Sequence, residues 1–122
     1  MARVKKVILA LAFLVLPSCG GGVNLTCDSR IVELRVHDTT CGQANVSWTI
    51  WQTTWEDRDS GIRNLPWSMS QELCTADIDL TAQRQCEDSG IVTVEIWVDG
   101  NLKRRDQGQG PSATAHIELW LD

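Results

Sequence analysis

Every second residue is apolar in five stretches of this 122-residue chain, and this period constrains the fold more than any other feature. The stripes are Val32/Leu34/Val36, Ala44/Val46/Trp48/Ile50, Ile78/Leu80/Ala82, Val92/Val94/Ile96/Val98 and Ile117/Leu119/Leu121. Successive side chains point to opposite faces of an extended strand, whereas a helix would need a period of 3.6. We therefore predict an all-β fold in which each strand buries one of its faces.

Turn-forming residues separate the stripes at 39–42, 57–61, 87–90 and 99–100, the last being Asp-Gly, a strong hairpin signal. The pattern weakens over 62–73, where Pro66 confines any strand to a sheet edge or to its own first residue. Residues 107–112 contain two glycines and a proline, so we expect a loop there. For residues 27–122 these features predict one immunoglobulin-like antiparallel β-sandwich of about seven strands.

The N-terminus has the order of an export signal. Three of the first six residues are basic, and the apolar run over 7–16 that follows is too short to span a membrane. The run closes on Leu-Pro-Ser-Cys19, which resembles the bacterial lipobox, and this resemblance implies that Cys19 is diacylated on its sulfur, as with palmitate. We predict a lipoprotein signal peptide over 1–18, and a lipidated Cys19 with a flexible glycine-containing tether over 19–26. The alternative is an ordinary cleaved signal with a cysteine nearby by chance.

Charge limits the class of partner. Without residues 1–18 the chain keeps 8 of its 11 basic residues and all 16 acidic residues, a formal charge of −8. This balance argues against nucleic acid or anionic lipid as the main partner, because phosphate contacts need clustered Lys and Arg. The one basic run, Lys103-Arg104-Arg105, is short and stands beside Asp106, so we interpret it as a solvent-exposed edge strand.

Setting Cys19 aside leaves Cys27, Cys41, Cys74 and Cys86, an even number that predicts two disulfides in an exported protein. A strand over 29–38 would hold Cys27 and Cys41 about 30 Å apart, and a strand over 76–84 would separate Cys74 from Cys86 for the same reason. Following an up-and-down path, we predict the pairs Cys27–Cys86 and Cys41–Cys74. One cross-arrangement of the same four residues is the competing alternative.

No catalytic, cofactor or metal site emerges from the sequence. It contains neither a serine nucleophile elbow nor a Gly-rich phosphate loop after a strand. His37 and His116 fall on the outward phase of their strands near carboxylates, but no nucleophile accompanies them. A zinc site is not expected, because the cysteines form no CxxC pair. We therefore predict a protein without enzymatic activity or cofactor.

Acidic residues gather twice, at Glu56, Asp57 and Asp59 and again at Asp77 and Asp79. The first group is similar to half of a calcium loop, but it lacks the later acidic ligands that complete one. We interpret it as the solvent-exposed tip of a hairpin.

Six tryptophans accompany one phenylalanine and no tyrosine. The alternation assigns Trp48 to the core and Trp51, Trp97 and Trp120 to outward faces. Outward aromatic side chains can form a contact surface, because they bury a large area at a small entropic cost. These three are our candidate binding residues. The alternative is that a loop covers them, that they stack across neighbouring strands, or that a β-bulge shifts their phase.

Several short motifs follow one another between residues 31 and 117. They are Leu65-Pro66-Trp67 after an acidic-glycine hairpin, a strand ending in Ala82-Gln83, a turn at Gly90, and Ile96-Trp97-Val98-Asp99-Gly100 before a glycine loop. This order resembles the soluble domain of the mycobacterial membrane protein small family, MmpS. The resemblance implies a small immunoglobulin-like sandwich, with Pro66 at an edge and Trp67 plugging the sandwich, and an accessory role to exporters of lipids and siderophores. The family's usual transmembrane anchor and cysteine pattern differ from those of this chain.

Together these features predict a non-enzymatic, lipid-anchored protein of the cell envelope, in the outer membrane of a Gram-negative host. We expect it to bind another protein or an envelope component, as an accessory to transport if the family resemblance extends to function. The alternative is a structural lipoprotein, or a small inhibitor that meets a cationic extracellular enzyme such as a lysozyme through its negative surface.

Overall fold

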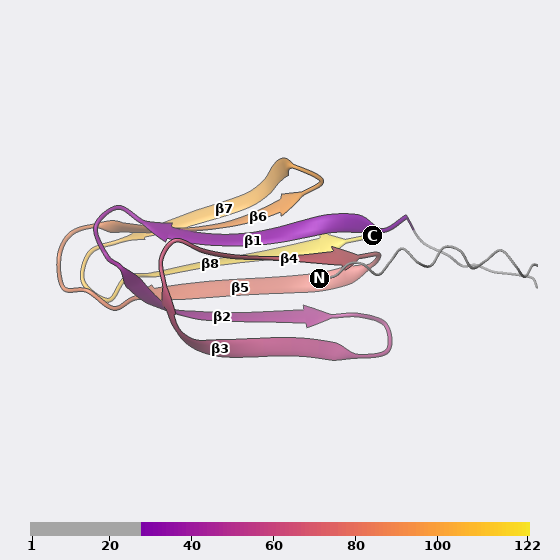
Figure 1. Cartoon of the computed structure of the whole chain (residues 1–122), viewed down its shortest axis with the longest axis horizontal. Coiled ribbons are helices and arrows are strands. Elements are labelled where there is room, and N and C mark those ends of the chain that lie inside the picture. The colour runs from indigo at the N-terminus through magenta and orange to yellow at the C-terminus, as the bar shows by residue number, and fades with distance from the viewer. Residues whose placement is uncertain (1–27) are drawn as a thin grey trace, which may run out of the picture.

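The computed structural model describes residues 28–122, so the predicted signal peptide, Cys19, the tether and Cys27 lie outside the described residues. Eight antiparallel strands form two four-stranded sheets packed face to face (Figure 1). The strands are β1 (Arg30–Asp38), β2 (Gln43–Trp51), β3 (Glu56–Asn64), β4 (Trp67–Leu73), β5 (Ala76–Arg84), β6 (Ile91–Val98), β7 (Asn101–Gln109) and β8 (Thr114–Leu121). The predicted all-β sandwich is confirmed, with eight strands in place of about seven. Over the described range, no helix has the length and apolarity needed to cross a membrane.

The core lies between sheet A, in the order β4-β1-β6-β7, and sheet B, in the order β3-β2-β5-β8. The inner phase of each predicted stripe is buried there, as Val36, Ile78 and Val94 illustrate with no exposed surface. Trp48 and Trp67 pack against this core as partly buried residues, in agreement with the sequence analysis. The period-two apolar pattern therefore predicted correctly the strands that have a neighbour on both sides.

β3 contradicts one prediction. Residues 57–61, expected to be a turn, lie in the middle of this strand, and the hairpin tip falls at 52–55 instead. β3 lacks an apolar stripe because it is an edge strand, paired on one side only with β2, and charged residues are typical of such edges. Asp59 is bound by Arg63 at 2.6 Å and Glu56 by Arg58 at 3.0 Å. The acidic group is thus part of a salt-bridged strand, and the hairpin-tip interpretation is wrong.

The additional strand also overturns the disulfide prediction. The chain crosses the sandwich twice between β2 and β5, as β3 and β4, whereas the predicted path implied one crossing. The second crossing carries Cys74 to the end opposite Cys41, and Cys41 bonds Cys86 instead. The pairs Cys27–Cys86 and Cys41–Cys74 are therefore wrong. Cys74 is disulfide-bonded as well.

β7 is an edge strand of sheet A and carries the basic run over 103–105, as predicted. It continues to Gln109, so the loop expected over 107–112 begins only after that residue. The hairpin from β6 to β7 turns through Asp99 and Gly100, whose φ angles of 51° and 82° are those of the Asp-Gly turn that the sequence indicated.

The two ends of the sandwich are distinct. The disulfide end, where β1 finishes and β2 begins, holds Asp38, Arg84 and the Cys41–Cys86 bridge. The tryptophan end, where β1 begins and β8 finishes, holds Trp51 and Trp120 (right in Figure 1).

Candidate functional site

Two of the three candidate tryptophans meet on the outer face of sheet B. Trp51 of β2 pairs with Asp77 of β5, and Asp77 pairs with Trp120 of β8, so the three residues form one row across the sheet. The exposed fraction is 44% for Trp51 and 63% for Trp120. Both indoles therefore stand on either side of one carboxylate with much of their surface open to a partner.

A hollow of about 260 Å³ opens beside this row. It is lined by Trp51, Gln52, Thr53, Thr75, Ala76, Asp77 and Trp120. Trp55, 47% exposed, belongs to the same hairpin loop as Gln52, whose backbone N–H donates to the Trp55 carbonyl at 2.8 Å. The period-two pattern could not identify Trp55, because it lies outside the strands. Aromatic faces beside a carboxylate are suited to a cation, which they attract through cation–π and charge interactions.

The next rows of the same face bring together three groups that the sequence presents far apart. Asp79 of β5 pairs with Glu118 of β8, and His116 precedes Glu118 by two residues on the same face. His116 Nε2 lies 2.9 Å from an Asp79 carboxylate oxygen and 4.0 Å from one of Glu118. The outer face of sheet B is thus both aromatic and acidic.

Trp97, the third candidate, lies on sheet A and does not join the other two. The Arg35 guanidinium stands over its ring, 4.3 Å from the centroid, and its indole N–H donates to Glu95 at 2.9 Å. The protein itself therefore occupies one face and the polar edge of this indole. Trp97 is thus covered in part, by a side chain of strand β1 and not by a loop.

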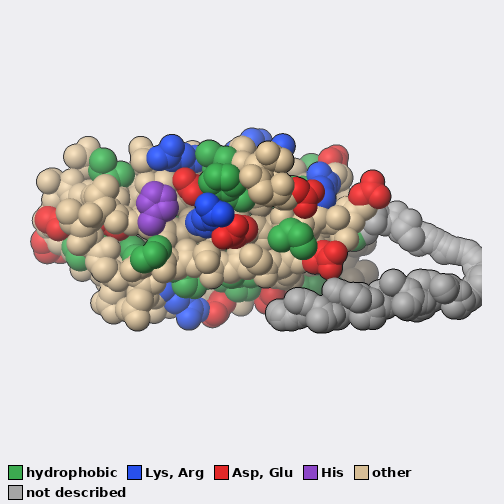
Figure 2. All heavy atoms as spheres, turned by 45° about the horizontal axis from the view of Figure 1, so that its top comes forward, with side chains coloured by type: hydrophobic (Ala, Val, Ile, Leu, Met, Phe, Trp, Pro, Cys, Tyr) green, Lys and Arg blue, Asp and Glu red, His purple; other side chains and the backbone are tan. Residues whose placement is uncertain are grey.

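The charged side chains around Trp97 on sheet A are paired with one another. Glu95, only 8% exposed, also lies 3.7 Å from His37 Nε2 and 3.7 Å from Arg105 Nε. The hydrogen bond to Glu33 raises the pKa of Arg35. Figure 2 brings this side forward and shows basic, acidic and apolar side chains interspersed. His37 belongs to this face and His116 to the other sheet, so the two histidines cannot act on one substrate together.

Arg84 organises the disulfide end. Its side chain is buried and binds Asp38 at 2.6 Å and Asp88 at 2.5 Å, and it also donates to the Gly110 carbonyl at 2.9 Å. A Cβ on Gly90 would lie 2.4 Å from the guanidinium, so only glycine fits there. The alternation that buries Ile78, Leu80 and Ala82 continues to Arg84, whose side chain also points inward. This continuation of the pattern was the available sign that Arg84 is buried.

These contacts shift the pKa values of the three charged groups. Burial alone would raise the pKa of Asp38, but hydrogen bonds from Arg84 and from the Thr40 and Cys41 backbone outweigh it and lower that pKa. The hydrogen bond from Arg84 lowers the pKa of Asp88, and the bond to Asp38 is the main reason that the pKa of Arg84 is raised. This ion-pair network is structural, because its central guanidinium is closed to solvent.

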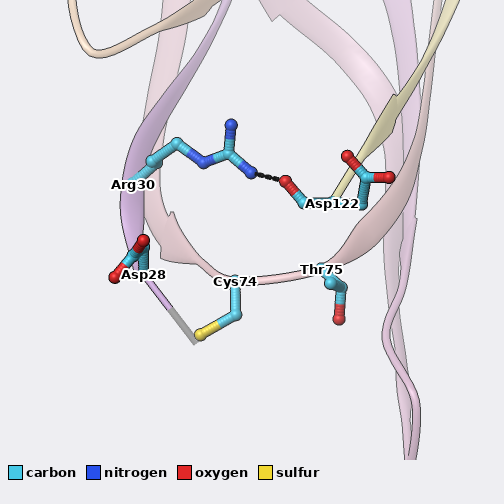
Figure 3. Close-up of a pocket in the computed structure, with 5 residues that line it drawn as sticks. All are labelled: Asp28, Arg30, Cys74, Thr75 and Asp122. Carbon is cyan, nitrogen blue, oxygen red and sulfur yellow. Dashed lines mark hydrogen bonds between the residues drawn. The ribbon is translucent and has the colours of Figure 1, made fainter. Parts of the chain in front are cut away.

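A second hollow, of about 370 Å³, lies at the tryptophan end and shares Thr75 with the first. Figure 3 shows Arg30 reaching across it to donate to the backbone carbonyl of Asp122, with Asp28 and Cys74 on its other walls. Exposed aromatic side chains do not line it, and one terminal nitrogen of Arg30 already donates to Asp122. We therefore assign the candidate binding site to the tryptophan row.

Comparison with known proteins adds no relative to this picture: no protein-family model matches the chain, and no curated protein matches it either.

Proposed function

We propose that this protein is a non-enzymatic, lipid-anchored component of the cell envelope that binds a cationic segment of a partner protein at the Trp51–Asp77–Trp120 row. The row supplies the observation that carries the proposal, since it presents two exposed indoles on either side of one carboxylate. Arg and Lys side chains are the protein groups that such a surface favours, through stacking and charge.

Charge complementarity supports a cationic occupant. The described residues include 8 basic and 16 acidic side chains, a formal charge of −8. The outer face of sheet B shares this sign: Asp77, Asp79 and Glu118 lie on it, and Arg58 is bound to Glu56 at 3.0 Å. A basic partner would be steered to this face and a nucleic acid repelled from it.

A peptide titration tests the site. The full-length chain should bind a hexa-arginine peptide, followed by calorimetry, and should not bind hexaglutamate. Trp120→Ser and Asp77→Asn should each weaken binding about tenfold, as expected for central contacts of an interface. Glu72→Gln and Trp97→Ser are the matched controls, because they remove one charge and one indole from sheet A. Equal weakening by Asp77→Asn and Glu72→Gln would reduce the effect to net charge and contradict the proposed site.

Photo-crosslinking from position 120 in cells then identifies the partner class. Capture of an exporter component would support a transport accessory, the role implied by the family resemblance. Capture of a secreted basic enzyme that the purified protein inhibits would support the inhibitor alternative.

The anchor has its own test. Labelling with an alkyne analogue of palmitate should mark the wild-type protein in cells and leave the Cys19→Ala variant unmarked. Labelling that persists in this variant would contradict lipidation at Cys19, without bearing on the tryptophan row.

A further inference from the structure

Asp79, His116 and Glu118 present three metal-binding groups at one point of sheet B. One donor atom from each lies within 4.8 Å of the other two. Asp79 and Glu118 face each other across the paired strands, and His116 stands beside both. A zinc site was not expected, because the cysteines form no CxxC pair. The sequence does not reveal this cluster, since its residues come from two strands that the hairpin β6–β7 separates in the chain.

The strand pairing places like charges together. Carboxylates directly opposite each other on neighbouring strands destabilise a sheet unless a cation neutralises them. Asp77 adds a third carboxylate two residues from Asp79 on the same face. Arg58, in the same cross-strand row as Asp79, is bound to Glu56. Within the described residues, His116 is the basic group that contacts this carboxylate pair.

We propose that Asp79, His116 and Glu118 form a binding site for a divalent metal ion, and that this ion is zinc. Zinc takes nitrogen and oxygen ligands at about 2.0–2.2 Å, which corresponds to about 3.4 Å between donors in a tetrahedral site. The distances from His116 Nε2, 2.9 Å and 4.0 Å, lie on either side of that value, so small side-chain rotations suffice. The imidazole disfavours calcium and magnesium, which prefer oxygen ligands.

Three protein ligands leave a fourth position open. All three side chains are partly exposed, so water or a side chain of another protein can reach the ion. The site goes beyond the proposed docking of a cationic segment and uses different residues, although both lie on the outer face of sheet B.

The chain contains a matched control in His37. This histidine is exposed to a similar degree, 45% against 48% for His116, and also lies beside a carboxylate. Its partner Glu95, however, is engaged by Trp97 and Arg105, and among residues 28–122 no second carboxylate lies within 4.0 Å of the imidazole. His37→Ala should therefore leave zinc binding unchanged.

Calorimetric titration of the chelator-treated, full-length chain with ZnCl2 tests the proposal. We expect one ion per chain, at least tenfold weaker binding by His116→Ala and by the near-isosteric Glu118→Gln, and no heat with MgCl2. Circular dichroism checks that each variant keeps its sheet content. Trp51→Ser and Trp120→Ser should bind zinc normally, so failure of peptide docking and failure of the metal site are distinguishable. Absence of zinc binding, or equal binding by the His116→Ala and His37→Ala variants, would overturn the site.

Discussion

The two ends of the sandwich use similar residue types for different purposes. At the disulfide end, charged groups are bound to one another: the buried Arg84 contacts the buried Asp38, the half-exposed Asp88 and backbone carbonyls beside the Cys41–Cys86 bridge. At the tryptophan end, Trp51, Asp77 and Trp120 face solvent beside a hollow. A charge that is already paired stabilises the fold, whereas a charge left among exposed aromatics offers a contact to another molecule. We infer that one end holds the sheets together and the other is free for binding.

The largest test of this contrast is to remove one carboxylate from each end. Asp38→Ala should lower the free energy of unfolding by about 3–5 kcal/mol, because it leaves a buried guanidinium without its main partner. Asp77→Ala should change it by no more than about 0.5 kcal/mol, as is usual for a surface position outside the core and the ion-pair network. Urea unfolding measures both. Comparable losses would mean that the tryptophan end is structural too.

The disulfide is the next test. Replacing Cys41 and Cys86 together by Ser should cost about 2–4 kcal/mol, because the bridge restricts a long segment of the unfolded chain. Thermal or urea unfolding of the double variant measures this loss. Peptide mapping without reduction should recover the Cys41–Cys86 peptide, and, with Cys19 lipidated, should join Cys74 to Cys27. A Cys41–Cys74 peptide would contradict the strand order.

The tryptophans provide a smaller and more specific contrast. Trp97→Ser should lower the free energy of unfolding by about 1–2 kcal/mol, since it removes the contact with Arg35 and the hydrogen bond to Glu95. Trp120→Ser should lower it by no more than about 0.5 kcal/mol. The comparison fails if the exposed indole proves as costly to remove as the covered one.

The smallest effect should appear in acid. The pKa values of Asp38 and Asp88 are lowered in the folded protein, so their stabilising contribution is complete at neutral pH and is lost as pH falls below about 4. Melting temperatures from pH 7 to pH 3 should show this decline, and Asp88→Asn should reduce its steepness. A profile that Asp88→Asn leaves unchanged would mean that other carboxylates control acid unfolding.

Much of the fold could be predicted from the hydrophobic period, because strands with two neighbours must bury one face. β3 escaped prediction for the same reason, since an edge strand needs no apolar stripe. That one omission reversed the direction of every later strand in the predicted path and exchanged the partners of Cys41 and Cys74. The turn at Asp99-Gly100 was still predicted correctly, because a tight turn depends on its own two residues.

The candidate site was only half predictable. Alternation placed Trp51 and Trp120 on outward faces, but their position on either side of Asp77 depends on the pairing of β5 with β8. The same pairing brings His116 to Asp79. No local pattern encodes it, because these strands are not consecutive in the chain.

The described chain starts at the tryptophan end, and Asp28 lies at a hollow next to the one that Trp51 lines. If the proposed anchor is at Cys19, the nine residue steps from Cys19 to Asp28 keep the tryptophan end within about 30 Å of the bilayer surface. A partner fixed in the same membrane would meet the row at a high effective concentration, so even a weak intrinsic affinity would suffice for occupancy. A partner diffusing freely in solution would gain nothing from this tethering.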